Sequence, residues 1–253
     1  MRRTANSWTI GLRDLASGKE STLLRSERYV ANALISGDGR RVLYSTGNGD
    51  ISAVAAAGGA ADSLCTRCGT VMGASRDGRR VLYEPLQNED LAEWDEETRA
   101  TRKVALRSGE GLLSGARYSA DGHWVAFFEI DNRTSATRVW IARADGAVPV
   151  ARENWIPVTE AGGSDRDPSW SPGGRVLYYL SERDGFRCIW ARRLDATAHP
   201  VGEAFAVQHL HAARWSMGEM SGYQVGLGAA PGRLVFALRE QAGNIWLQEA
   251  ATK

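Results

Sequence analysis

The sequence predicts an all-β protein, a β-propeller of four-stranded antiparallel blades, from two observations. First, a serine-led turn is followed each time by a short apolar run such as Val-Leu-Tyr, and the leading serines Ser36, Ser75, Ser119 and Ser171 are 39, 44 and 52 residues apart. That spacing is close to the roughly 40–50 residues of a propeller blade. Second, the apolar runs are continuous, which is typical of a strand whose sheet is covered on both faces.

The fullest copy of the unit runs from Asp167 to Ala191. It predicts a strand ending at Ser171, a Gly-Gly turn, a buried strand over 175–180, a polar loop and a third strand ending at Trp190. Shorter copies occupy 36–44, 75–83, 119–127 and 230–236. Most copies place Asp-Gly at the turn, because a two-residue hairpin connection needs a positive φ, which Gly tolerates.

Taken in order, the repeats predict one domain, residues 1–253, with about six blade-like units. The first unit is expected to be incomplete, since Trp8–Leu15 and Ser21–Arg25 match only a third and a fourth strand. The last unit carries a second strand at Arg233–Leu238 and a third at Asn244–Glu249 and then stops, so we expect a truncated or fragmentary gene. The predicted units are 1–26, 27–65, 68–106, 111–159, 165–207 and 214–253.

In one segment, the amino-acid composition and the repeat predict different secondary structures. Residues Leu86–Thr98 have a helical composition, but Leu91–Trp94 falls where the repeat requires a third strand. Strand formation depends strongly on context, so we expect the register of the repeat to prevail and helix to be nearly absent.

The motif Ser-x-Asp-Gly-x-x-Val-Leu-Tyr, with a later Ile-Trp strand, resembles the repeat of TolB-like β-propellers over nearly the entire chain. The C-terminal part, through Leu180–Trp190, Pro200–His211 and Gly243–Leu247, is similar to the propeller of large bacterial proteins. Those proteins place it after a serine/threonine kinase or a winged-helix region. The resemblance therefore implies a signalling or scaffold module, detached from a kinase or regulator.

Charge and hydropathy exclude some classes of function. The net charge of +1 is spread along the chain and gives no clustered basic face, so we expect no nucleic-acid binding. No run of about 18 apolar residues predicts a membrane span. The N-terminus has basic residues but no apolar segment behind them, which predicts a cytoplasmic chain as written. The resemblance to periplasmic TolB instead implies the periplasm if the chain is cut from a longer precursor.

The cysteines give one short motif, Cys65-Thr-Arg-Cys68. Two thiolates at this spacing can coordinate one zinc ion or form a redox pair. No second such motif follows, and His209 and His211 are three blades further on, so a structural pair, as dithiol or disulfide, is favoured over a metal site and over redox catalysis. Cys188 is interpreted as a small buried hydrophobe in a strand. We expect no cofactor.

Three polar motifs have two interpretations each. His209 and His211 lie on one side of an extended strand, so they either bind a metal or face water, and we favour water. The acidic residues before Pro168 are expected to join adjacent blades rather than to contact a ligand, an expectation that the family resemblance implies. Arg183 either pairs with a neighbouring carboxylate or faces a ligand.

The predicted topology gathers the loops between blades and the loops between second and third strands on one rim. Residues 163–167, 182–185 and 208–211 belong to these loops. We therefore predict a ligand-binding sector made of Asp165, Arg166, Asp167, Arg183, Asp184, His209 and His211.

No catalytic motif appears in the sequence, neither a Gly-x-Ser-x-Gly elbow, nor a phosphate loop, nor His-Glu-x-x-His. The expected function is a non-catalytic module that binds a protein, a peptide or a small polar ligand. The alternative is a propeller enzyme of the lyase, glycosidase or peptidase-associated type.

Overall fold

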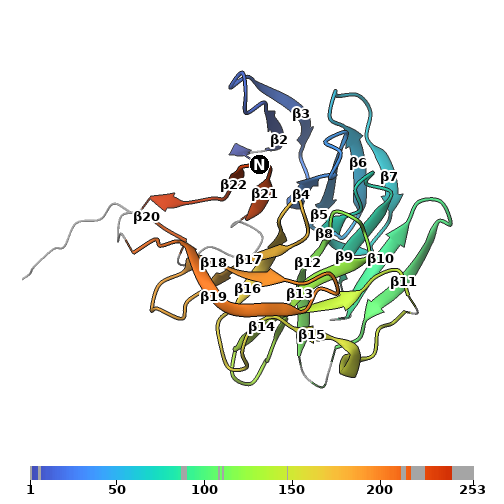
Figure 1. The fold of residues 1–253 in the computed structure, drawn as a ribbon. Coiled ribbons are helices and arrows are strands. Elements are labelled where there is room, and N and C mark those ends of the chain that lie inside the picture. The colour runs from blue at the N-terminus through green and yellow to red at the C-terminus, as the bar shows by residue number, and fades with distance from the viewer. Residues whose placement is uncertain are drawn as a thin grey trace, which may run out of the picture.

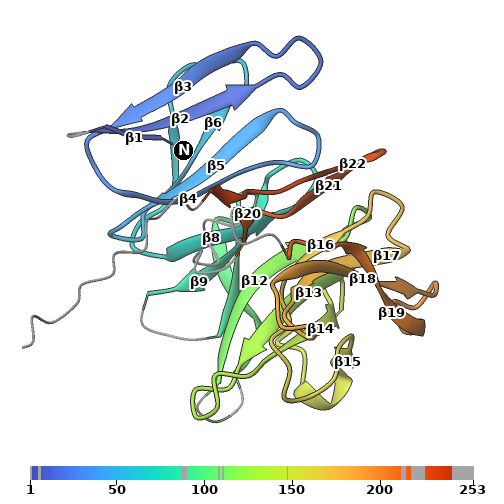
Figure 2. The same ribbon diagram turned by 90° about the vertical axis from the view of Figure 1, so that its left-hand side faces the viewer.

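The computed structural model describes residues 2–4, 7–86, 90–107, 109, 111–146, 148–211, 215–217 and 226–240. Within these ranges the chain is almost entirely β-strand, and the helical content is one 3₁₀ turn, Arg152–Asn154. The sheets follow one another around a ring in chain order (Figure 1 and Figure 2). The predicted fold class, a β-propeller, is confirmed.

Four sheets of four antiparallel strands form the body of the ring. The strands are β4 (Val30–Ile35), β5 (Arg41–Thr46), β6 (Ile51–Ala55) and β7 (Asp62–Cys65); β8 (Gly69–Ala74), β9 (Arg80–Pro85), β10 (Leu91–Asp95) and β11 (Ala100–Ala105); β12 (Leu112–Tyr118), β13 (Trp124–Ile130), β14 (Thr137–Arg143) and β15 (Ile156–Pro157); and β16 (Arg166–Trp170), β17 (Val176–Ser181), β18 (Cys188–Leu194) and β19 (Pro200–Gln208). The helix-like segment thus contains strand β10, so the repeat register outweighs local composition.

The first sheet has three strands, β1 (Arg2–Thr4), β2 (Ser7–Arg13) and β3 (Glu20–Ser26). The sequence predicted two, and the difference is β1, whose three residues pair antiparallel with β2. Such a short strand without a turn motif carries no pattern of its own.

The last unit is described in part, as β20 (Trp215–Ser216) paired with β23 (Arg239–Glu240) and the hairpin of β21 (Gly228–Ala230) and β22 (Arg233–Val235). The predicted strand Arg233–Leu238 begins with β22 but extends past its end. The predicted strand Asn244–Glu249 lies outside the described residues.

The repeated serine motif is a turn held by its own side chains. Ser36 Oγ donates to Asp38 Oδ1 at 2.6 Å, Asp38 Oδ1 accepts from the Arg40 N–H at 3.0 Å, and Ser36 Oγ accepts from the Arg41 N–H at 3.0 Å. The φ of Gly39 is 73°. The copies that begin at Ser75 and Ser119 repeat the same bonds. The motif therefore recurs because it builds the first hairpin of these three blades.

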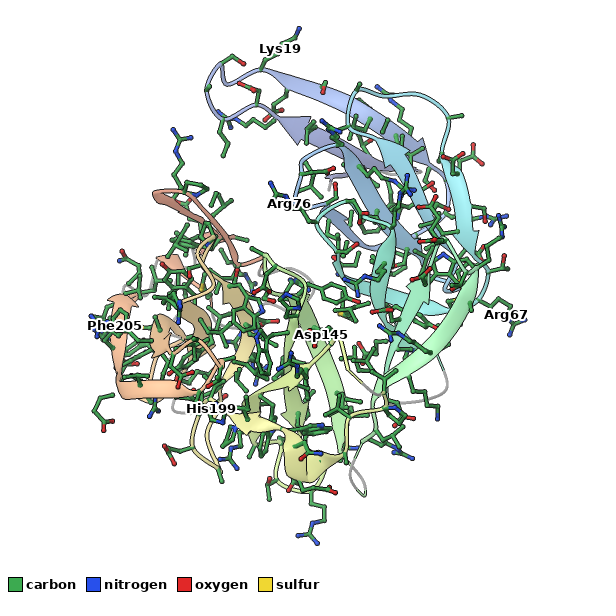
Figure 3. All side chains as sticks on the ribbon, turned by 45° about the vertical axis from the view of Figure 1, so that its right-hand side comes forward. Lys19, Arg67, Arg76, Asp145, His199 and Phe205 are labelled. Carbon is green, nitrogen blue, oxygen red and sulfur yellow. A yellow bond between two sulfur atoms is a disulfide. The ribbon has the colours of Figure 1, made fainter. Side chains whose placement is uncertain are left out.

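The core lies between the sheets, and alternate residues of one strand face opposite neighbours. On β13, Val125 and Phe127 pack in a cluster with β8–β11, while Ala126 and Phe128 pack in a cluster with β16–β19. Similar clusters join the other consecutive units. Side chains fill the spaces between neighbouring sheets in Figure 3. Burial on both faces explains why the strands are continuously apolar.

Strand direction alternates within each sheet, so the connections fall at two ends of the ring. We call the end with the loops between second and third strands and between sheets the upper rim, and the end with the serine-led turns the lower rim. Among the described residues, no helix is long and apolar enough to cross a lipid bilayer.

Candidate functional site

The seven predicted site residues come from the upper rim at the β16–β19 blade, but they separate into three groups. Asp165 and Arg183 form the first group, and Arg166 and Asp167 begin strand β16. The third group is Asp184, His209 and His211. Arg183 and Asp184 are neighbours in the chain, yet they contact different groups.

Arg183 is held by an internal network. Its Nη2 lies 3.5 Å from Asp165 Oδ1, and the Asp165 side chain is buried. The Arg183 guanidinium also donates to Tyr179 Oη at 3.1 Å and to Ser181 Oγ at 3.0 Å, and it lies 4.6 Å from the centre of the Trp190 ring. Arg183 therefore pairs with a carboxylate, one of the two predicted roles, and about a third of its side chain stays exposed.

A pocket of about 640 Å³ opens beside this network. It is lined by residues 134–136, 160, 162–165 and 181–183. These residues come from the β13–β14 loop, the loop between two blades and the β17–β18 loop. The sequence placed parts of all three loops on one rim, and here they surround a single pocket.

Asp167 lies against the neighbouring blade. Its φ is 52° at an irregularity in the pairing of β16 with β17, and its Oδ2 is buried without a hydrogen-bond partner among the described residues. Burial raises the pKa of Asp167 to about 6, although the charges of Arg117, Arg166 and Arg187 oppose the shift. Burial lowers the pKa of Arg117, and the charge of Asp167 partly offsets this effect. Asp167 thus links β16 electrostatically to β12.

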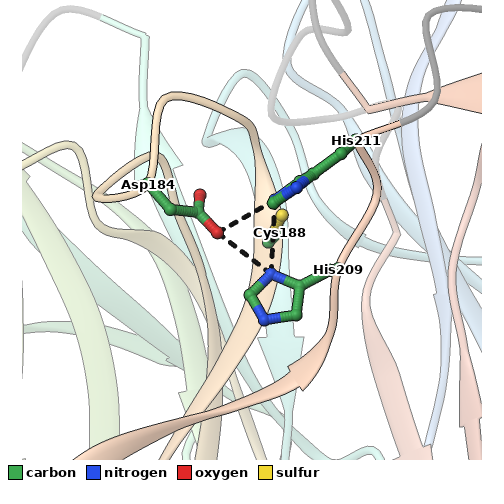
Figure 4. A group of neighbouring side chains, drawn as sticks. All are labelled: Asp184, Cys188, His209 and His211. Carbon is green, nitrogen blue, oxygen red and sulfur yellow. Dashed lines mark hydrogen bonds and ion pairs between the residues drawn. The ribbon is translucent and has the colours of Figure 1, made fainter.

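The third group is a compact cluster of possible metal ligands (Figure 4). His209 Nδ1 and His211 Nε2 each lie 3.0 Å from Asp184 Oδ2, and the two nitrogens are 3.2 Å apart. Cys188 Sγ is the fourth donor, and all four ligand atoms lie within 4.8 Å of one another.

Neighbouring groups fix the members of this cluster. The Phe186 ring stacks on His211 with centroids 4.5 Å apart, and Trp190 meets His209 edge-on at 5.9 Å. The Leu210 N–H donates to Cys188 Sγ at 3.3 Å. Burial raises the pKa of the Cys188 thiol. Burial also acts to raise the pKa of Asp184, but hydrogen bonds, led by the one from His211, hold it below its usual value.

Sequence reasoning missed two residues. Cys188 is fully buried, as expected, but its sulfur points into the cluster (Figure 4). Its position at the rim end of β18, four residues after Asp184, was the available signal. Arg117 was also missed, because nothing in the sequence shows that it faces Asp167 of the adjacent blade.

Cys65 and Cys68 form a disulfide, with Cα atoms 6.0 Å apart. The bridge lies between β7 and β8, where Arg67 has a φ of 52° and its N–H donates to Asp50 Oδ1 at 3.0 Å. The disulfide therefore constrains an inter-blade loop on the upper rim, away from the His209 cluster.

Comparison with known proteins finds no family profile that matches the chain. An uncharacterised protein of Agrobacterium fabrum is 28% identical over 109 residues, which are 43% of this chain and 34% of that protein. TolB from Acinetobacter baumannii superposes with a TM-score of 0.63 over 92% of this chain and 57% of that chain, at 16% identity. A chain of the nidogen/laminin complex gives 0.63 over 86% of this chain and 75% of that chain, at 10% identity.

At these identities the structural likeness shows the fold alone, the β-propeller fold of TolB-like proteins. The matched part of the chain spans about a third of its Agrobacterium relative.

Proposed function

We propose that this chain, which has the propeller fold of TolB-like proteins, is a non-catalytic module that binds a polar segment of a partner protein. The binding site is the upper-rim pocket between the β12–β15 and β16–β19 blades. The observation that carries the proposal is that three loops from two blades surround one open pocket of about 640 Å³. Loops on a rigid scaffold are where binding residues concentrate.

The lining of the pocket suits a polar occupant. Glu160, Glu182 and Arg183 contribute charge, and 162–164 contributes small residues. The side chain of Glu160 is 90% exposed, and that of Glu182 is 38% exposed. Arg183 is preorganised by Asp165, so little side-chain entropy is lost when its exposed edge meets a ligand.

The comparisons support a protein as the partner, because one chain with this fold was solved in a complex of two proteins, nidogen and laminin. A role beside a kinase or a winged-helix regulator is part of the proposal and rests on the sequence resemblance. We also propose a periplasmic location, which the resemblance to TolB implies and which fits the persistence of disulfides such as Cys65–Cys68 in oxidising compartments.

The experiment selects peptides from a random displayed library on the wild-type protein and measures their affinity by fluorescence anisotropy. Ala136→Trp fills the pocket, and Arg183→Ala removes its guanidinium. Each variant is expected to weaken binding at least tenfold. The matched control is Asp38→Ala in a lower-rim turn, which should leave affinity unchanged in folded protein. Peptides that bind Ala136→Trp as tightly as wild type would show that the pocket is not the site.

A further inference from the structure

We propose that Asp184, Cys188, His209 and His211 bind one zinc ion as a structural site on the upper rim. The four ligand atoms belong to two segments, the start of β18 with the loop before it and the chain just after β19. The inference goes beyond the proposed function, because metal binding here requires no partner protein.

The distances between the ligand atoms fit a shared cation better than hydrogen bonds between these atoms. Three atoms, Asp184 Oδ2, His209 Nδ1 and His211 Nε2, form a triangle with sides of 3.0, 3.0 and 3.2 Å. If each imidazole donates to the carboxylate, two N–H groups face each other across the third side. If one imidazole donates to the other, one nitrogen–oxygen contact has no proton. A central cation satisfies all three sides at once.

Zinc bonds of about 2.0–2.3 Å in tetrahedral geometry separate neighbouring ligand atoms by about 3.3–3.7 Å. The triangle is slightly smaller than that, and the sulfur lies within 4.8 Å of the other ligand atoms. Small side-chain movements therefore complete a tetrahedron. A set of one thiolate, two imidazoles and one carboxylate favours zinc over magnesium or calcium, which prefer all-oxygen sites.

Surrounding groups provide the outer shell that such sites need. The Leu210 N–H already donates to Cys188 Sγ, a bond that stabilises a thiolate. Phe186 and Trp190 pack against the two imidazole rings and set their orientation. Metal binding releases the thiol proton, so affinity should increase with pH.

The site has a structural consequence. Zinc ties the 182–185 loop to the segment that leads from β19 into the last unit. Arg187 supports the same junction, since its guanidinium donates to Met217 O at 3.0 Å and to Glu182 Oε1 at 2.6 Å. The ion therefore fixes how the last full blade meets the unit that follows it.

The test measures bound zinc per chain by plasma mass spectrometry after the full chain is stripped with a chelator, reloaded with zinc and desalted. Zinc affinity is then obtained by competition with a chromogenic chelator. The wild type should hold about one zinc per chain. His211→Ala, whose side chain is 44% exposed, should fold and lose at least about 100-fold in affinity, because even outer-shell changes cost 10–100-fold.

Cobalt provides a spectroscopic readout. The wild type loaded with Co²⁺ should show a thiolate charge-transfer band, and Cys188→Ser should lose this band. His199→Ala, an exposed histidine in a turn of the same blade, is the matched control and should keep full zinc affinity. Absence of stoichiometric zinc from the reloaded wild type, equal affinity in His211→Ala, or loss of zinc on Cys68→Ser would each overturn the assignment.

Discussion

Asp167→Asn should stabilise the protein at neutral pH, because it removes a carboxylate whose ionisation is disfavoured by burial. Asp167 Oδ2 is buried, and no residue that the structure describes forms a hydrogen bond with it. Burial raises the pKa of this carboxyl from 3.8 to about 6. Asn has nearly the same shape and mimics the neutral acid. The nearby Arg117 charge lowers the cost of ionising Asp167 but does not cancel it.

The sign and size follow from linkage. When the pKa of a carboxyl is raised in the folded state, the protonated carboxyl stabilises that state fully below pH 3.8. This stabilisation is lost as the pH rises from 3.8 to about 6, and none of it is left at higher pH. The free energy of unfolding therefore falls by at most about 3 kcal/mol over this window, since each pKa unit is worth about 1.4 kcal/mol. Asp167 as a whole is partly exposed, so solvent screening reduces this figure.

The assay is urea unfolding of wild type and Asp167→Asn at a series of pH values from 4 to 8. The difference in free energy of unfolding, variant minus wild type, should increase by up to about 2 kcal/mol between the ends of the series. Carboxylates with lowered pKa values, such as Asp145 at about 2, are common to both proteins and cancel in the difference. A difference that does not change with pH would refute the reasoning about burial.

Two further predictions concern backbone and thiols. Gly73→Ala should lower the free energy of unfolding by about 1–3 kcal/mol, because a Cβ there would meet Ala116 O of the next blade at 2.5 Å, whereas Gly146→Ala, with nothing within 4 Å, should be neutral in the same urea assay. Thiol titration of unfolded, chelator-treated, unreduced protein should find one free thiol per chain, that of Cys188, and three would contradict the disulfide.

Most of the fold could be predicted because its determinants are local. A serine, an aspartate and a glycine build the first hairpin of three blades by bonds within about five residues, so the motif is visible wherever it occurs. Continuous apolar strands likewise indicate that both faces of the sheet are buried. Strand β1 could not be predicted, because its formation depends on pairing with β2 rather than on a pattern in its own three residues.

The candidate site could be predicted only to the level of loops. Topology alone places 163–167, 182–185 and 208–211 on one rim. It does not fix side-chain direction, so it could not separate Arg183, which turns to Asp165, from Asp184, which turns to the two histidines. The direction of the Cys188 side chain is likewise a result of packing, and its spacing of four residues from Asp184 is the one sign of it in the sequence.

Binding of a polar partner segment in the upper-rim pocket can be measured by hydrogen–deuterium exchange. The full chain is compared with and without a peptide selected on the wild-type protein. Exchange should slow in 133–137, 160–165 and 181–185 and stay unchanged in the lower-rim turns 36–40, 75–79 and 119–123. Protection of the lower-rim turns with no change around the pocket would contradict binding in the pocket.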